Sequence, residues 1–560
     1  MQVPQSPVEF QTYAFGKRYA WYALFLLMLV AAFNLIDRMI VTILAGEIKT
    51  DLGLSDSEFG ILYGTSFAIF YALFGIPLGR LADTWLRTRL LSIGLASWSF
   101  MTMLSGLAAN MAQFSLTRIG VGMGEASSGP TATSLLADYF PRKMRSTALA
   151  LYSCGIPIGL GLSLVLGGSI SSQWNSWYPD GNFPLGLSGW RVAFIAVALP
   201  GLLLAIAVAF LKEPQRGVSE GLLQAVEAHP FKKSWQEFLA AIPPFTFYGF
   251  AVSGMPLRVW VRNLALLFTL ILGVILISGF INDLVTLKTG QIYAQWQGFR
   301  VTAHTVQWTA LAFGIYSVIS WAQSLEYRDR PAFRLILGTP VVLALIFAGA
   351  LFMVIVNGLM AWAPLFAVTQ YHESIASVGL RFGAVAAIAG LAGTALGGVL
   401  GDRLQRKNPG GRLLVSLFAM VLPAPLAWMT LSQETFNGFL LSFVFLSVVT
   451  TAWIAGILST LQDLVLPRMR GLVYATFYLG MTIVGLGTGP YLVGLISDLT
   501  GQLVTGILAL YLLTPLILLI MVFAIRGVDE TGKTKIARAL AAGESLPAHA
   551  AENFSQGVVH

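Results

Sequence analysis

Residues 21–45 read WYALFLLMLVAAFNLIDRMIVTILA, an apolar run interrupted by Asp37 and Arg38. Such a run is long enough to cross a bilayer as one helix. A charge at membrane depth is costly, so it usually faces a bundle interior or a watery cavity. A second run, QFSLTRIGVGMGEASSGPTATSLLA from residue 113, holds Arg118 and Glu125 in the same way. We expect these charges to serve transport of something charged; the alternative is structural ion pairs that fix helix packing.

The composition indicates a polytopic membrane protein. Of the 560 residues, 56% are hydrophobic and only 11% are charged, against about 25% charged in a soluble domain. The net charge of +8 comes with Lys and Arg in short loops between apolar runs, where they set topology, so it does not predict a nucleic-acid partner. The single cysteine, Cys154, excludes an internal disulfide. No signal-peptide pattern precedes the first run, so we expect the first helix to be kept.

Apolar runs of membrane-spanning length fall into two sets of six. They lie near 21–45, 59–79, 90–109, 113–138, 147–171 and 191–211, and then near 340–367, 378–400, 412–431, 437–463, 471–497 and 503–525. Between the sets, 263–281 and 303–322 predict an inserted hairpin outside this twelve-helix core, which makes about 14 spans; interfacial helices are the alternative. The weaker run 238–257, broken by Pro243 and Pro244, fits an interfacial position better.

Basic residues concentrate in alternate loops, which places both termini in the cytoplasm by the positive-inside rule. The polar segment after Gly527 predicts a disordered cytoplasmic tail. The expected organisation is therefore an all-α membrane protein. It has a six-helix half at 1–211, a cytoplasmic linker with the inserted hairpin at 212–339, a second six-helix half at 340–526, and the tail at 527–560.

Two loops recur in the two halves. GRLADTWLRTR at 79–89 matches GGVLGDRLQRK at 397–407, and DYFPRKMR at 138–145 matches DLVLPRMR at 463–470. Two matches at corresponding positions imply halves related by an axis along the membrane normal, with a substrate site near the midplane between them. We expect these loops to control closure of the cytoplasmic side. The residues assigned to this gating are Gly79, Asp83, Arg87, Asp138, Arg142, Gly398, Asp402, Arg403, Asp463 and Arg468.

The first loop resembles the signature of the major facilitator superfamily, although Thr84 stands where an arginine is usual; the second copy keeps Arg403. The stretches NLIDRMIVTILAGEIKTDLGLSDSEFGIL and TRIGVGMGEASSGPTATSLLADYFP resemble the bacterial branch of the spinster family. The resemblance is dense over about 5–211 and looser over 340–525, and the 230–330 insertion departs from the family's twelve spans. It implies the major facilitator fold, alternating access in a bacterial inner membrane, and a sphingolipid-like or lysolipid-like substrate by kinship.

The charged positions suggest proton coupling. Asp37 lies about 12 Å from the outer end of its helix and Arg118 about 8 Å deep in its own, at 1.5 Å per residue, so the two can meet. A carboxylate beside an arginine stays ionised, and burial without that partner favours protonation. We predict that Asp37 takes and releases a proton as Arg118 moves away and returns. Glu125, seven residues after Arg118 and on the same helical face, could act as a relay or second acceptor.

The same region predicts an anion-binding site. The planar guanidinium of Arg118 suits a phosphate or a carboxylate, while Arg38 is either a site residue or a structural one. Other aromatic and polar side chains are expected to line the cavity, with ordinary helix packing as the alternative for each aromatic. The expected substrate-binding residues are Arg118, Asn34, Arg38, Thr42, Tyr63, Phe67, Phe70, Asn357, Trp362, Trp453 and Tyr474.

A polar first half beside an aromatic second half favours an amphipathic organic anion, such as a lysophospholipid or a sphingoid-like lipid. The alternatives are a compact organic anion, such as a sugar acid or carboxylate, and a drug or metabolite exporter. No HExxH, GxSxG or Walker motif and no Cys/His cluster is present, so we predict no enzyme activity, cofactor or metal. A receptor or channel is disfavoured by the duplication. The expected partners are the small-molecule or lipid substrate, protons and membrane lipid, and the expected state is a monomer.

Overall fold

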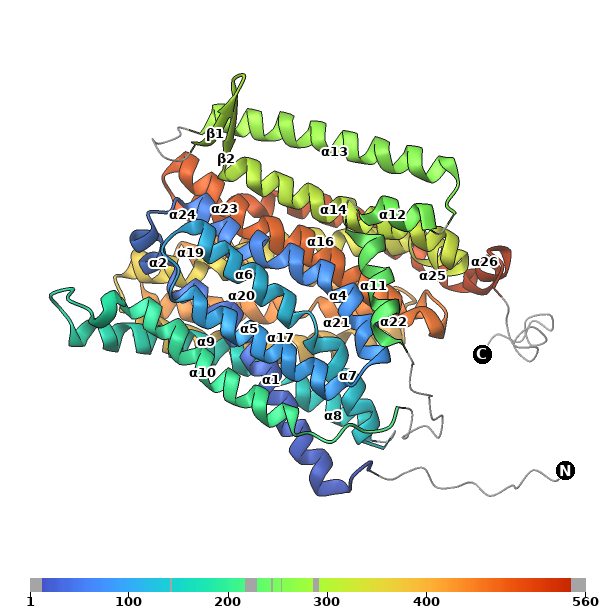
Figure 1. The fold of residues 1–560 in the computed structure, drawn as a ribbon, viewed down its shortest axis with the longest axis horizontal. Coiled ribbons are helices and arrows are strands. Elements are labelled where there is room, and N and C mark those ends of the chain that lie inside the picture. Colours follow the sequence, from blue (N-terminus) through green and yellow to red (C-terminus); the bar gives the residue numbers. More distant parts are fainter. Residues whose placement is uncertain are drawn as a thin grey trace.

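Long, roughly parallel helices make up almost all of the described chain (Figure 1). The computed structural model describes residues 13–141, 144–216, 229–242, 245–252, 254–285 and 292–544. Arg142 is outside the described residues. The all-α class and the helical character of the predicted spans are confirmed.

The first half contains six long helical stretches, several of them divided by short irregular turns. The second stretch, for example, starts at a capping box between Ser55 and Glu58 and passes through one π-helical turn. The elements are α1 (Lys17–Ile43), α2 (Ala45–Leu52), α3 (Asp56–Gly60), η1 (Ile61–Thr65), α4 (Ser66–Thr84), α5 (Arg87–Ser105), α6 (Met111–Glu125), α7 (Ser128–Tyr139), α8 (Arg145–Ser153), α9 (Gly155–Trp177), η3 (Pro184–Gly186) and α10 (Gly189–Ala209).

The second half repeats this plan. Its fifth stretch carries a π-helical turn, as the second stretch of the first half does. The elements are α16 (Pro340–Tyr371), α17 (Ile375–Gln405), α18 (Gly411–Val421), α19 (Pro423–Leu431), α20 (Phe436–Thr451), α21 (Ile454–Asp463), η5 (Pro467–Met469), α22 (Arg470–Gly480), η6 (Met481–Leu486), α23 (Gly487–Thr500), α24 (Leu503–Ala509), η7 (Leu510–Leu513) and α25 (Thr514–Lys533).

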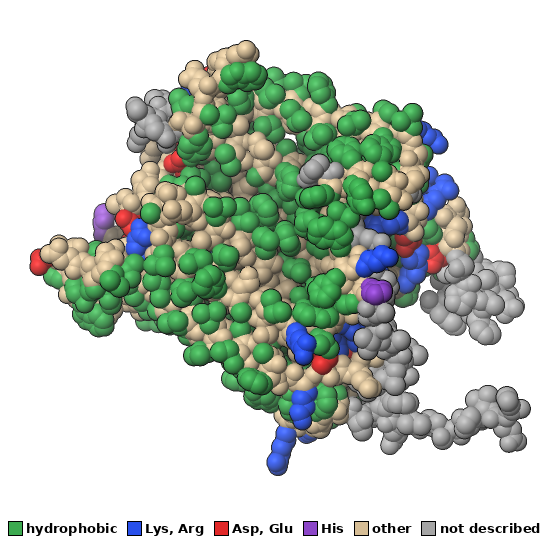
Figure 2. Space-filling view, viewed as in Figure 1, with side chains coloured by type: hydrophobic (Ala, Val, Ile, Leu, Met, Phe, Trp, Pro, Cys, Tyr) green, Lys and Arg blue, Asp and Glu red, His purple; other side chains and the backbone are tan. Residues whose placement is uncertain are grey.

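Eleven helical stretches of the described chain are long and apolar enough to cross a membrane. The stretches α5, α6–α7 and α14 are outside this set, although they run beside the others (Figure 1). Figure 2 shows apolar side chains covering the flank of the bundle, whereas most Lys and Arg side chains in this view gather near one end. The spanning character of the bundle is thus evident, and the count of about 14 stays a prediction.

The inserted segment forms a helical hairpin with a small β-hairpin at its tip. Its elements are α11 (Pro230–Ala241), α12 (Phe245–Val252), α13 (Leu257–Leu284), β1 (Ile292–Trp296), β2 (Phe299–Thr302), α14 (Ala303–Arg328) and α15 (Arg330–Ile336). Asn263 of α13 donates to Ser320 Oγ (2.8 Å) and Gln323 Oε1 (3.0 Å) of α14. Such pairing satisfies polar groups within the protein, as lipid surroundings require. The sequence did not predict the β-hairpin.

The two arms of this hairpin differ in their surroundings. α13 lies at the edge of the molecule (Figure 1), as expected for a hairpin outside the core. α14 instead packs against both halves, on α4 of the first and on η6 of the second. Hydrophobic periodicity identifies an apolar helix but does not indicate what lies on either side of it, so this contact was not predictable.

The prediction of a disordered tail from Gly527 is wrong over the described residues. α25 continues to Lys533, and α26 (Lys535–Ala541) follows. α26 packs on α15, where Arg538 Nη1 donates to Thr339 Oγ1 (2.5 Å). The alanine-rich sequence of α26 favours a helix, and α15 of the linker between the halves provides a surface for it.

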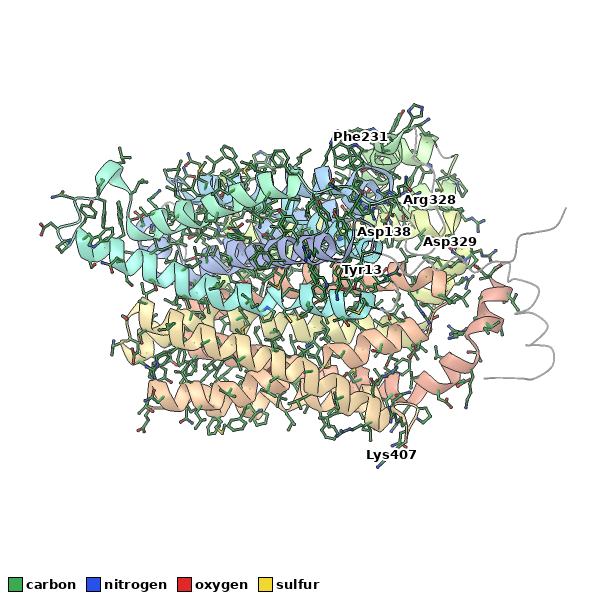
Figure 3. All side chains as sticks on the ribbon, turned by 90° about the horizontal axis from the view of Figure 1, so that it is seen from below. Tyr13, Asp138, Phe231, Arg328, Asp329 and Lys407 are labelled. Atoms are coloured by element: carbon green, nitrogen blue, oxygen red, sulfur yellow. The ribbon has the colours of Figure 1, made fainter. Side chains whose placement is uncertain are left out.

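The repeated loops of the two halves lie at one end of the bundle. Figure 3 places Tyr13, Asp138, Asp329 and Lys407 at this end. We call it the loop end and the other one the far end. The common position of the loops agrees with the two-half organisation read from the sequence.

Candidate functional site

Four charged side chains of α1 and α6 lie together inside the first half. Arg38 Nη2 donates to Glu125 Oε2 (2.7 Å) and, more weakly, to Asn34 Oδ1 (3.4 Å) one helical turn earlier. The side chain of Glu125 is fully buried, whereas that of Arg38 keeps 18% exposure. Arg38 is therefore the partly exposed member of this pair.

Arg118 and Asp37 are neighbours in an unexpected way. Arg118 Nη1 donates to the main-chain oxygen of Asp37 (3.0 Å), and the other Arg118 donors, Nε and Nη2, have no partner among the described residues. Both carboxyl oxygens of Asp37 are likewise buried and unpartnered, next to the side chains of Trp98 and Thr102 on α5. The predicted Asp37–Arg118 ion pair is not formed in this structure.

The rotation of α1 explains the change of partners. Consecutive helical residues point about 100° apart, so Asp37 and Arg38 cannot both face α6. Arg38 faces Glu125, while Asp37 is turned toward α5. The expected cluster is present, but Glu125 pairs with Arg38. The sequence had not decided whether Arg38 is a site residue or a structural one.

Aromatic rings of α4 lie under the two arginines. The guanidinium of Arg38 lies 4.4 Å from the ring centroid of Phe67 and 5.1 Å from that of Tyr71, and Arg118 lies 5.6 Å from Phe67. Cations are attracted to such ring faces. Tyr71 was missed, although its position four residues after Phe67 puts it on the same helical face.

The second half faces this cluster with tyrosines. The rings of Tyr474 and Tyr478 lie 4.4 Å apart, and Tyr474 is 42% exposed. Both lie near Tyr71 of the first half, and Tyr474 also lies near Tyr152. Tyr71, which lies over Arg38, thus connects the charged cluster to the predicted Tyr474 and to Tyr478 and Tyr152.

Several predicted substrate-binding residues lie elsewhere or are used in packing. Trp362 is fully buried and donates to the Pro490 main-chain oxygen (3.0 Å), and Trp453 packs on Phe352 and Phe477. Three other members of this group donate hydrogen bonds to neighbouring atoms: Thr42 to Met39 O, Asn357 to Met353 O and Tyr63 to the Met39 sulfur. Phe70 is half-buried.

At the far end the two halves are joined closely. The carboxylate of Asp498 accepts hydrogen bonds from the main-chain nitrogens of Asp56 (3.0 Å) and Ser57 (2.8 Å), so a residue of α23 caps α3. A Cβ at Gly60 would lie 2.6 Å from the Pro490 carbonyl oxygen, so only glycine permits this approach. α9 and α17 pack together as well. The far end is closed between the halves.

At the loop end the ion pairs hold each half separately. Arg87, buried, pairs with Asp138 (2.5 Å) and Glu213 (2.7 Å) of the first half. Arg412 pairs with Asp402 and Asp463 (both 2.8 Å) of the second. The two networks correspond, and Arg412, outside the repeated motif, was not predicted.

The remaining gating residues have different surroundings. Asp83, Arg403 and Arg468 are exposed, and Arg468 pairs with Asp329 (2.7 Å) and with Glu544 near the chain end. Hydrogen bonds from Arg468 lower the pKa of Asp329, so this pair stays charged in mildly acidic solution. At Gly79 and at Gly398, an added Cβ would have one neighbouring atom, at 3.9 Å, an ordinary van der Waals contact.

Within the described residues, no group of three or more His, Cys, Asp or Glu side chains could hold a metal ion.

Comparison with known proteins agrees with the predicted family. Residues 27–487 match the model of the Major Facilitator Superfamily. A protein of Mycolicibacterium smegmatis named MFS-type efflux pump is 26% identical over 505 residues, which are 89% of each chain. Protein spinster of Drosophila melanogaster is 23% identical over 501 residues, which are 89% of this chain and 65% of that protein. The predicted likeness to spinster proteins is confirmed.

One shorter match and one solved structure add detail. The probable L-galactonate transporter of Escherichia coli is 30% identical over 190 residues, 34% of this chain and 39% of that protein. The crystal structure of a bacterial homolog of the human lysosomal transporter spinster, inward-facing and unoccupied, has a TM-score of 0.66 at 21% identity. It covers 92% of this chain and 99% of that one. This likeness shows the fold.

Proposed function

Because this chain belongs to the major facilitator superfamily, whose members carry small-molecule substrates, we propose that it is a proton-coupled secondary transporter of an organic anion. It would work by alternating access as a monomer in the bacterial inner membrane, with both termini in the cytoplasm. Its bacterial relatives and the basic loops support this location.

The carboxyl group of Asp37 carries the proton-coupling part of the proposal. Its two oxygens are buried without a hydrogen-bond partner. Burying an ionised carboxylate without a partner is very costly, whereas the protonated acid is neutral and costs far less. We therefore assign a bound proton to Asp37 in this conformation. Arg118, already on the main-chain oxygen of the same residue, would favour proton release once its guanidinium meets the carboxyl group.

The closure pattern supports an inward-facing state. The halves are capped onto each other at the far end through Asp498, while the ion pairs of Arg87 and Arg412 at the loop end stay within their own halves. The loop end is cytoplasmic by the positive-inside rule. Substrate and proton would then exchange with the cytoplasm in this state.

Arg38 is the proposed contact for the substrate's acidic group. It is exposed enough to be reached, and its planar fork suits a carboxylate or phosphate. A bound acid would compete with Glu125 for the guanidinium, so Glu125 could respond to binding. The ring of Tyr71 lies 5.1 Å from this cation and is half-buried, and Tyr474, near Tyr71, is 42% exposed, so both offer apolar surface; Phe67 is fully buried under the cation. An amphipathic anion, such as a lysophospholipid or a sphingoid-like lipid, fits this combination best.

A compact sugar acid is the second candidate, because a relative at 30% identity is named a probable L-galactonate transporter. Both candidates place an acidic group on Arg38. They differ in whether the aromatic surface binds a hydrocarbon chain.

A thermal-shift screen of the purified protein against lysophospholipids and sugar acids tests the substrate class. The stabilising compound should lose its effect in Arg38→Ala. Arg191→Ala is the matched control, because Arg191 also lies over an aromatic ring, 4.4 Å from Trp190, but at the far end and paired with Asp51. Equal losses in both variants would contradict the assignment of Arg38. Stabilisation by sugar acids alone, with lysolipids inert in transport by proteoliposomes, would exclude the lipid class.

A further inference from the structure

Helix α14 of the inserted hairpin occupies the seam between the two halves. It packs on α4 and η1 of the first half and on η6 of the second, and Figure 1 shows it running along the bundle inside α13. Leu311 of α14 belongs to one buried cluster with Ala72 of α4 and with Leu479 and Ile483 of the α22–η6 stretch. The seam is therefore filled by a third element.

A glycine brings α14 close to both halves at once. A Cβ at Gly314 would lie 3.3 Å from a side-chain carbon of Ile483 and 3.6 Å from one of Ile69. A methyl group here would be tight against Ile483 and in ordinary van der Waals contact with Ile69. α14 is thus fitted to the width of the seam in this conformation.

A buried polar contact also joins α14 to both halves, nearer the far end. Gln307 of α14 donates from Nε2 to the Gly487 main-chain oxygen of the second half (2.8 Å). Its Oε1 accepts from the hydroxyl of Thr65 in the first half. The Thr65 hydroxyl also lies 2.6 Å from the same Gly487 oxygen. Gln307 and Thr65 are both buried, so water does not compete for these bonds.

A second contact lies one turn away on α14. His304 Nδ1 and the Tyr491 hydroxyl are 3.1 Å apart, and both side chains are buried. Tyr491 belongs to α23, which also carries the closing carboxylate of Asp498. α14 therefore holds the helix of the second half that must move when the far end opens.

We propose that the inserted hairpin stabilises the closed state of the far end, with Gln307 as the central residue of this contact. We call this contact the latch. This inference rests on the proposed alternating access. Opening the far end separates Thr65 from Gly487, and one amide cannot stay bonded to both. The insertion is held by both halves: α11 is fixed to α4 through the bond from Ser234 Oγ to Pro77 O (2.7 Å), and Asp329 at the end of α14 pairs with Arg468 (2.7 Å).

Cysteine accessibility in the purified protein tests the latch without substrate or a proton gradient. Cys154→Ser removes the only cysteine, and Ser57→Cys places a reporter where the far end is closed, at a side chain that is 2% exposed. Gln307→Met then removes both hydrogen bonds and keeps a similar side-chain volume. Two ordinary hydrogen bonds correspond to a shift of roughly five- to 150-fold in the open population. Labelling by a maleimide should accelerate accordingly.

Gln323→Met is the matched control. It changes the same residue type on the same helix, but Gln323 is bonded within the hairpin, to Asn263. Unchanged labelling in Gln307→Met, or an equal increase in Gln323→Met, overturns the latch. Asp498→Ala, which removes the cap on α3, reports separately on far-end opening. If it accelerates labelling while Gln307→Met does not, the latch fails and alternating access stands.

Discussion

Arg118 bonds to the main-chain oxygen of Asp37 at 3.0 Å and leaves the carboxyl group of the same residue unpaired. The guanidinium is therefore next to the residue that carries the buried acid but does not pair with that acid. In the proposed mechanism, contact between this guanidinium and the carboxyl group favours the ionised acid, and their separation favours the protonated one. In the adjacent Arg38–Glu125 pair the arginine side chain keeps 18% exposure, and we propose that it contacts the substrate.

Replacing Arg38 by lysine should weaken binding of the stabilising anion by about tenfold or more, because a bidentate charged hydrogen bond is lost while the charge is kept. Arg118→Lys should have a smaller effect on affinity, since Arg118 is fully buried beneath the site. Isothermal titration of the purified variants measures both. A larger loss in Arg118→Lys would show that Arg118 is the anion-binding residue.

Arg87 should be far more important for stability than its counterpart Arg412. Arg87→Ala removes the buried cation that Asp138 and Glu213 share, and breaking a buried pair costs about 3–5 kcal/mol. The partners of Arg412 are each 61% exposed, and such surface pairs contribute about 0–1 kcal/mol. Thermal unfolding in detergent compares the two alanine variants. Similar losses of stability in both would contradict the difference in burial.

Glu47 should make the protein less stable as pH rises. Burial raises the pKa of this far-end carboxyl group, despite hydrogen bonds from Ser171 (2.6 Å) and Asn175 (3.2 Å). The folded state then holds a proton that the unfolded chain loses, so stability falls between the unfolded and folded pKa values. Glu47→Gln should therefore raise the melting temperature at about pH 7 relative to the parent, and less at about pH 4. A gain that is larger at the lower pH would contradict the sign.

Much of this arrangement follows from sequence. The two sets of apolar runs predicted the helices of both halves, and the four intramembrane charges predicted the position of the candidate site. Periodicity could not give the pairing within that site. Asp37 and Arg38 are consecutive, so the rotation of α1 decides which of them meets Glu125, and tertiary packing sets that rotation.

Other features depend on contacts between distant segments. Trp362 and Trp453 have the residue type of a binding site, but the structure buries them in packing. Tyr71 becomes a site residue because Arg38 reaches over its ring. Gln307 is one of several polar residues in its helix, and its importance is visible only where Thr65 and Gly487 meet it.

Substrate-driven proton movement tests the central claim most directly. Proteoliposomes containing a pH-sensitive dye should acidify or alkalinise when the identified anion is added to the parent protein. In Asp37→Asn, an uncharged isostere of the protonated acid, the anion should still exchange across the membrane without moving protons. Asp51→Asn, at the far end and paired with Arg191, should behave as the parent. Proton movement of parental size in Asp37→Asn would contradict the assignment of this carboxyl group as the proton carrier.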